Sequence, residues 1–163
     1  MKILLRKTEE CNVQVLNVYQ QLGALGTVMS AGGKTVLLID DEAPTRDFIG
    51  RVLRDAGYTV LEGSSYDEAV TLYQQYSEEV DLLLVDAALP ERNGFELAAS
   101  LHLIRPELIV LFTSGHVGSQ LCRFYGMSPT DVHFLGKPFI AIELIERVKC
   151  LLMPRGRSNS VSM

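Results

Sequence analysis

The sequence predicts an α/β fold in which helices cover both faces of a five-stranded parallel sheet. Short apolar runs alternate with stretches of helical length over residues 35–152. Strands that alternate with helices of this length indicate βαβ units and a parallel sheet that is covered on both faces. Three of the runs, VLLIDD, DLLLVD and VHFLGKPF, end in acidic or basic residues. In an open sheet of this class, ligands bind at the carboxyl ends of the strands.

The order of the elements gives the topology. The apolar runs predict strands at residues 36–39, 58–62, 82–85, 109–113 and 132–135. The stretches between and after them predict helices at residues 43–56, 66–77, 94–104, 117–126 and 139–152, of which 117–126 has the weakest pattern. Gly57 stands where a helix C-cap is expected, and Pro106 stands where the third helix must end. Five such units predict a doubly wound, flavodoxin-like (βα)5 fold.

Composition excludes several classes of function. The chain has 163 residues, 47% of them hydrophobic and 21% charged, which is typical of one compact domain. Its net charge is −5 and it has no basic stripe, which argues against direct nucleic-acid binding. No apolar run reaches the ~20 residues of a membrane span and no signal peptide is evident, so we expect a cytoplasmic protein. Cys11, Cys122 and Cys150 lack metal-ligand spacing and are expected to be reduced thiols.

Two segments fall outside the regular pattern. Residues 1–34 are expected to form an N-terminal extension, with a short helix at about residues 8–23 followed by a Gly-rich linker, although a disordered extension fits equally well. Residues 153–163 are expected to form a flexible polar tail. The domain itself is therefore placed at residues 35–152.

Asp40, Asp41 and Asp86 would bring three carboxylates to one edge of the sheet. Two carboxylates about 4 Å apart repel each other by roughly 4 kcal/mol at an effective dielectric of ~20, so such a cluster either protonates or recruits a cation. Oxygen ligands with room for water suit Mg²⁺. Lys137 adds an ammonium group, which suits a phosphoryl oxygen. Asp41 alone could be a helix N-cap, but its combination with Asp86 and Lys137 favours a site.

Thr113 and Ser114 end the fourth predicted strand. Because neighbouring side chains of a strand alternate, one hydroxyl should point into the carboxylate cluster and the other away from it. The residues alone leave the choice open.

The segment DAALPERNGFEL, residues 86–97, carries the most specific pattern. Asp-x-x-x-Pro-x-x-x-Gly-x-Glu-Leu lies about 45 residues after the paired acids and about 50 residues before Lys-Pro-Phe. In this arrangement the chain resembles the response-regulator receiver domains of two-component signalling, including chemotaxis-type receivers. The resemblance extends from Thr35 to about Leu152.

This resemblance implies roles for individual residues. Asp86 matches the phospho-accepting aspartate, and Asp40, Asp41 and Asp86 match the Mg²⁺ ligands, with the backbone carbonyl of Ala88 as a further ligand. Lys137 matches the phosphoryl-binding lysine, and the peptide bond between Lys137 and Pro138 matches the cis bond of the family.

The resemblance also implies a switch and a control of phosphoryl lifetime. Ser114 matches the switch hydroxyl, with Thr113 as the alternative, and Phe134 matches the switch aromatic residue. Ala88 and His116 stand at the two positions that influence how long the phosphoryl group survives.

The implied function is that of a signalling receiver with Mg²⁺-dependent phosphotransfer and autodephosphorylation, and not of a metabolic enzyme. A sensor histidine kinase or a phosphotransfer protein would phosphorylate Asp86. The face made by the fourth helix, the fifth strand and the last helix would then bind a downstream protein target or a second copy of the chain. The alternative is a constitutive interaction scaffold whose acid pocket is not phosphorylated. A stand-alone regulator and a receiver from a hybrid kinase both fit the sequence.

Overall fold

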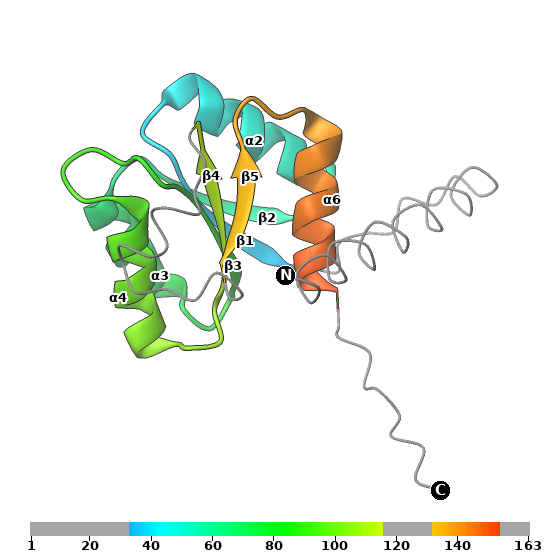
Figure 1. The fold of residues 1–163 in the computed structure, drawn as a ribbon. Helices are drawn as coiled ribbons and strands as arrows, with labels where there is room; N and C mark the ends of the chain where they lie inside the picture. The colour runs from blue at the N-terminus through cyan, green and yellow to red at the C-terminus, as the bar shows by residue number, and fades with distance from the viewer. Residues whose placement is uncertain (1–32, 116–131, 154–163) are drawn as a thin grey trace, which may run out of the picture.

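The computed structural model of the protein describes residues 33–115 and 132–153 (Figure 1). The expected N-terminal helix, the expected helix at residues 117–126 and the polar tail lie outside the described residues. Within the described ranges, no helix is both long enough and apolar enough to cross a bilayer.

Five parallel strands form one sheet, as the sequence predicts. They are β1 (Thr35–Ile39), β2 (Thr59–Gly63), β3 (Val80–Asp86), β4 (Ile109–Ser114) and β5 (His133–Gly136). Their order across the sheet is β2-β1-β3-β4-β5. The order reverses at β1, which is the topology of a doubly wound, flavodoxin-like fold and confirms the predicted fold class.

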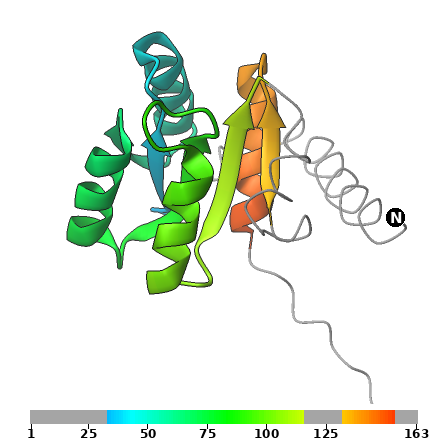
Figure 2. The ribbon, with the colours of Figure 1, turned by 60° about the vertical axis from the view of Figure 1, so that its left-hand side comes forward.

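The described helices cover the two faces of the sheet in pairs. They are α2 (Ala43–Asp55), α3 (Tyr66–Tyr76), α4 (Gly94–Ile104) and α6 (Ala141–Leu152). Helices α2 and α6 pack on one face, and α3 and α4 lie side by side on the other (Figures 1 and 2). Gly57 follows α2 with a φ of 91°, a left-handed conformation that ends the helix where the sequence predicts.

The central strands are buried on both faces, which explains why they read as continuous apolar runs. In β1, Leu37 and Ile39 belong to the core under α3 and α4. Val36 and Leu38 belong to the core under α2 and α6. All four side chains are at most 1% exposed.

The amino end of the sheet is fastened by one carboxylate. Asp81, near the start of β3, accepts a hydrogen bond of 2.9 Å from the backbone N–H of Thr35. It also forms a 2.7 Å ion pair with the exposed side chain of Lys34. This ion pair lies at the opposite end of β1 from Asp40, and its lysine is more exposed than Lys137.

One expectation about the cysteines is wrong. Cys150, in α6, is disulfide-bonded, with its partner outside the described residues. Separation along the chain was a poor guide, because cysteines that are remote in sequence can meet in the fold.

Tyr73, in α3, is 1% exposed, and within the described part of the structure its hydroxyl has no hydrogen-bond partner. Burying an unsatisfied hydroxyl costs about 1–3 kcal/mol, so Tyr73→Phe should raise the free energy of unfolding by about 1 kcal/mol. Tyr66→Phe is the matched control, because the Tyr66 hydroxyl lies 2.8 Å from Ser100 Oγ. Its loss should lower stability by about 1 kcal/mol. Urea unfolding followed by circular dichroism measures both, and equal destabilisation by the two changes would contradict the prediction.

Candidate functional site

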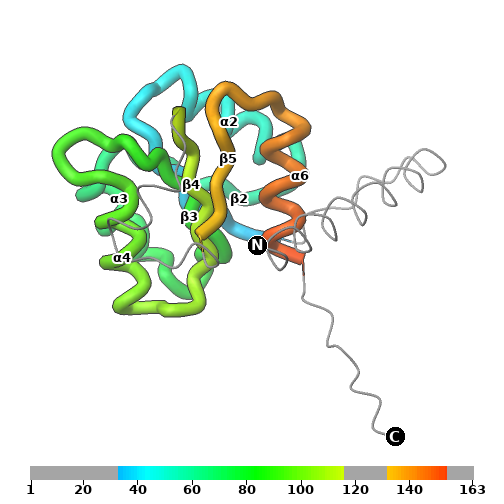
Figure 3. Tube along the Cα trace, viewed as in Figure 1, coloured from blue at the N-terminus to red at the C-terminus, as the bar shows by residue number. Residues whose placement is uncertain are grey.

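The acidic cluster forms at the carboxyl edge of the sheet. Asp40 follows β1 directly, and Asp86 is the last residue of β3, the neighbouring strand. Carboxylate oxygens of Asp40, Asp41 and Asp86 all lie within 4.8 Å of one another. The loops after β1, β3 and β5 lie at the same end of the sheet (Figure 3), so parallel strands bring residues remote in sequence into one site.

Lys137 reaches this cluster from the far side of β4. Its Nζ lies 2.5 Å from Asp86 Oδ2 and 3.0 Å from Asp40 Oδ2. Its backbone N–H donates a 2.8 Å hydrogen bond to the carbonyl of Ser114, which fastens the end of β5 to the end of β4. The Lys137–Pro138 peptide bond is cis, as the resemblance implies. One ammonium group therefore pairs with two carboxylates.

Burial and attraction act in opposite directions on these charges. Burial raises the pKa of the Asp40 carboxyl above 3.8, even though Lys137 and the Glu42 N–H both favour the ionised form. Burial alone would lower the pKa of Lys137, but its bonds to Asp86 and Asp40 outweigh that effect and hold the pKa above 10.5. The two raised pKa values are consistent with each other. Two carboxylates stabilise the charged form of Lys137, whereas Asp40 shares one ammonium group with Asp86.

Asp86 is held by the chain that follows it. Its Oδ1 accepts a 2.8 Å hydrogen bond from the Ala88 N–H. The backbone of Gly94, at the start of α4, lies so close that a side chain there would collide with the Asp86 carbonyl. This close approach explains the glycine of the Asp-x-x-x-Pro-x-x-x-Gly pattern. Asp86 is 7% exposed, while Ala88, two residues further on, is exposed.

Thr113 and Ser114 are both buried at the end of β4. Thr113 is in register with Asp86, and Ser114 is in register with Gly136. Phe112 lies in the core under α3 and α4, so alternation places Ser114 on that side of the sheet and Thr113 on the other.

Phe134 is half-buried and packs against the same core. Its ring centroid lies 5.5 Å from that of Phe112 and 6.1 Å from that of Phe95. Ser114 and Phe134 therefore share one side of the sheet. His116 lies outside the described residues.

Arg46 contacts the cluster although it is not among the site residues predicted from the sequence. Its Nη1 donates a 2.6 Å hydrogen bond to the backbone carbonyl of Asp40. One signal was available: Arg46 stands near the start of α2, which has no acidic residue in its first turn. A cation is unfavourable at this end of a helix, so an arginine there calls for a local partner.

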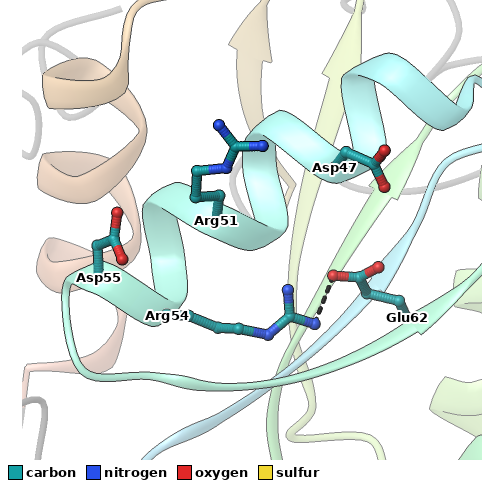
Figure 4. Close-up of a pocket in the computed structure, with 5 residues that line it drawn as sticks. All are labelled: Asp47, Arg51, Arg54, Asp55 and Glu62. Carbon is teal, nitrogen blue, oxygen red and sulfur yellow. Dashed lines mark hydrogen bonds and ion pairs between the residues drawn. The ribbon is translucent and has the colours of Figure 1, made fainter.

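Two hollows adjoin α2. One, of about 500 Å³, is lined by Pro44, Thr45, Phe48, Lys137, Pro138 and Phe139. The other, of about 300 Å³, is lined by Asp47, Arg51, Arg54, Asp55 and Glu62 (Figure 4). In the second hollow, Arg54 reaches across to Glu62 of β2 at 2.6 Å, and the mixed charges favour no single ligand. The first hollow, beside Lys137, is the one that adjoins the acidic cluster.

A doubly wound sheet with an acidic cluster and a lysine at its carboxyl edge has the architecture of a receiver domain. The family model of the response regulator receiver domain matches residues 36–149. The chain therefore belongs to the response regulator receiver family of two-component signalling, as the sequence predicts.

Individual relatives agree with this assignment. The response regulator receiver protein CpdR of Brucella abortus is 32% identical over 121 residues, which are 74% of this chain and 98% of CpdR. The sensor kinase CckA of the same organism is 35% identical over 75% of this chain and 13% of the kinase. The regulatory protein PhoB of Pseudomonas aeruginosa is 35% identical over 78% of this chain and 56% of PhoB. The chain thus spans only part of the length of CckA and PhoB.

Solved structures agree as well. The crystal structure of the receiver domain of the hybrid histidine kinase CckA superposes with a TM-score of 0.62 at 31% identity, over 73% of this chain and 99% of that one. A receiver protein from Sinorhizobium medicae gives a TM-score of 0.63 at 28% identity, over 75% of this chain and 97% of that one.

Lys137→Met should lower the free energy of unfolding at pH 7 by roughly 3 kcal/mol, because it leaves buried carboxylates without a cation. The deficit should shrink as the pH falls, because burial already raises the pKa of Asp40 and the loss of Lys137, which opposes that rise, would raise it further in the variant. The folded variant then takes up a proton at a higher pH than the folded parent and regains stability. Urea unfolding in EDTA at several pH values measures this. Lys34→Met, which breaks the exposed pair with Asp81, should cost no more than about 1 kcal/mol. A Lys137→Met deficit as small as that of Lys34→Met would contradict the prediction.

Proposed function

We propose that this receiver is phosphorylated on Asp86 by a histidine kinase or a phosphotransfer protein. The observation that carries the proposal is the contact of the Lys137 ammonium with the Asp86 carboxylate, inside a cluster of three acids. A phosphoryl group on Asp86 would lie beside the Lys137 ammonium group, which already contacts this carboxylate. A carboxylate with a purely structural partner would not need two further acids beside it.

The cluster also suits Mg²⁺, the cation that we propose for it. Asp40, Asp41 and Asp86 supply oxygen ligands within 4.8 Å of one another, and the carbonyl of the exposed Ala88 would be a fourth. Asp41 is exposed, which leaves room for the water molecules that Mg²⁺ retains. When bound, the metal would neutralise charge on the phosphoryl oxygens.

The transfer itself needs a nucleophile and positioned charge. In the proposed step, an Asp86 carboxylate oxygen attacks phosphorus in line, the new P–O bond forms and the P–N bond of the donor phosphohistidine breaks. The imidazole leaves with the electron pair of that bond. Lys137, placed 2.5 Å from Asp86 Oδ2, would then bind a phosphoryl oxygen. Hydrolysis of the acyl phosphate by water would later release phosphate and restore Asp86.

A protein donor fits the surface around the site. The hollow beside Lys137 is lined by Pro44, Phe48 and Phe139, and the Phe48 side chain is 42% exposed. An apolar rim next to a charged centre suits a protein that presents a phosphohistidine from an apolar surface.

The proposed output passes through Ser114 and Phe134. Ser114 is our switch hydroxyl in preference to Thr113, because alternation puts it on the side of Phe134. An acyl phosphate on Asp86 would draw the hydroxyl inward, and Phe134 would pack more deeply in response. Helix α6 follows β5 and begins beside the exposed Ile140 and Ile142, which offer an apolar contact to a downstream protein or a second copy of the chain. We place this function in the cytoplasm.

Asp86→Ala should abolish phosphorylation, because the remaining carboxylates serve the cation. Incubation with Mg²⁺ and a small acyl-phosphate donor, followed by intact-mass analysis, should add one acid-labile phosphoryl group to the parent protein and none to the variant. Asp47→Ala, an exposed acid on α2, should be labelled like the parent. Undiminished labelling of Asp86→Ala would move the acceptor elsewhere. A parent protein that takes no label under these conditions would favour the constitutive scaffold.

Ala88 and His116 should tune the lifetime of the acyl phosphate. The Ala88 side chain is too small to orient or block an attacking water, so Ala88→Asn or His116→Ala should change the dephosphorylation rate several-fold, about 1 kcal/mol in barrier. Phosphorylation itself should survive, because neither side chain has a role in holding the cation or the phosphoryl group. Decay of radiolabelled protein after donor removal measures the rate. Parent-like decay in both variants would show that these positions do not control it.

A further inference from the structure

Asp40 has a partner at every polar atom. Its N–H donates to the Gly63 carbonyl at 3.2 Å, and its Oδ1 accepts from the Glu42 N–H at 2.9 Å. Its Oδ2 accepts from Lys137 at 3.0 Å, and its carbonyl accepts from Arg46 Nη1 at 2.6 Å. The Arg46 bond is thus the contact that fixes the carbonyl, and with it the peptide unit that joins Asp40 to Asp41.

Asp41 depends on that peptide unit. Within residues 33–115 and 132–153, no hydrogen bond or ion pair holds its exposed carboxylate, yet this carboxylate lies in the acidic cluster. The carbonyl of Asp40 and the N–H of Asp41 belong to one planar group. The orientation of that plane therefore fixes the N–Cα bond of Asp41 and restricts the directions in which its side chain can leave the backbone.

The charge of Arg46 also reaches the start of α3. Hydrogen bonds from the N–H and hydroxyl of Ser64 lower the pKa of Glu68, and the charge of Arg46 adds a smaller effect in the same direction. The hydrogen bond of Arg46, however, goes to the Asp40 carbonyl in the turn after β1.

The charge of Arg46 would act against the cation. A guanidinium bonded to the backbone of Asp40, a member of the cluster, repels a divalent ion, so its charge alone would weaken Mg²⁺ binding. Its hydrogen bond would strengthen binding by holding Asp41 in place. The charge of Arg46 and its hydrogen bond would change the affinity for Mg²⁺ in opposite directions, so substitutions of Arg46 can separate the two effects.

We propose that Arg46 is a positioning residue of the cation site, which aims the Asp41 carboxylate through its hydrogen bond to the Asp40 carbonyl. The proposal rests on the function proposed above, because it assumes that the cluster binds Mg²⁺. It assigns Arg46 no contact with the metal or the phosphoryl group. Its contribution is the geometry of the turn.

The first test needs no metal. Arg46→Gln should speed hydrogen exchange of the Glu42 amide several-fold in EDTA, because this N–H bonds to Asp40 within the turn that Arg46 holds. Arg51→Gln is the matched control, since Arg51 is an exposed arginine on the same helix with no ion pair in the described part of the chain. NMR-detected exchange measures both. Equal exchange of the Glu42 amide in the two variants would overturn the proposal.

The second test measures Mg²⁺ affinity by NMR titration of the folded proteins. Arg46→Gln should raise the Kd about fivefold, the equivalent of one lost hydrogen bond. Arg46→Lys keeps the charge, loses the planar guanidinium, and should also raise the Kd. If the charge of Arg46 is its only influence, Arg46→Gln will instead lower the Kd and Arg46→Lys will match the parent, and the proposal fails.

Asp41→Asn separates this proposal from the proposed function. Suppose that the parent binds Mg²⁺, that Asp41→Asn abolishes this binding, and that Arg46→Gln leaves the Kd unchanged. In that case only the proposed role of Arg46 is wrong. If the parent shows no Mg²⁺ binding, the cation site and the function that depends on it both fail.

Discussion

One ammonium group shared by two carboxylates holds the carboxyl edge of the sheet together. Lys137 contacts Asp86, the last residue of β3, and Asp40, which follows the neighbouring β1, while Lys137 itself follows β5, two places away from β3 in the sheet. Without it, buried acids would face one another with no compensation. The contact requires β5 to end beside β4, and the bond from the Lys137 N–H to the Ser114 carbonyl fixes that end. The chain can thus fold with its acids assembled before a metal or a phosphoryl group arrives.

Sequence alone predicted the parts of this arrangement that depend on strand periodicity. Strands buried on both faces leave continuous apolar runs, and reactive residues at their ends must meet when the strands are parallel. Strand periodicity does not predict the bond from Arg46 to the Asp40 carbonyl, because a backbone acceptor has no residue type. The signal in the sequence was the unfavourable place of an arginine near the start of α2, which does not identify its partner. The pairing of Cys150 was missed for a similar reason, since it depends on distance in space. The position of Gly94 was clear in the pattern, but its cause, the carbonyl of Asp86 pressed against it, needed the structure.

The aromatic residues suggest how a change at the site reaches the surface. Phe95 follows Gly94, which touches the backbone of Asp86, and Phe112 precedes Thr113. Phe134 stands three residues before Lys137. The rings of these three phenylalanines pack against one another with centroids 4.4–6.1 Å apart. Each ring therefore belongs to a different element. Each also lies within three residues, along the chain, of a candidate site residue or of Gly94, which packs against Asp86. Close-packed rings do not move independently. A shift of the element that carries one of these rings must therefore be accommodated by the two elements that carry the other rings.

The acidic cluster carries a free-energy cost at the place where we propose that it binds Mg²⁺. Burial raises the pKa of Asp40, which means that the ionised form of this carboxylate is less favourable in the folded protein than in the unfolded chain. An ion pair in such a place contributes little to folding, because desolvation offsets attraction. A bound cation would relieve that cost, and above its Kd the added stability would grow with the logarithm of the cation concentration. Arg46 fits this balance. It places a positive charge beside the acids, and its hydrogen bond ends on a backbone carbonyl and not on a carboxylate oxygen.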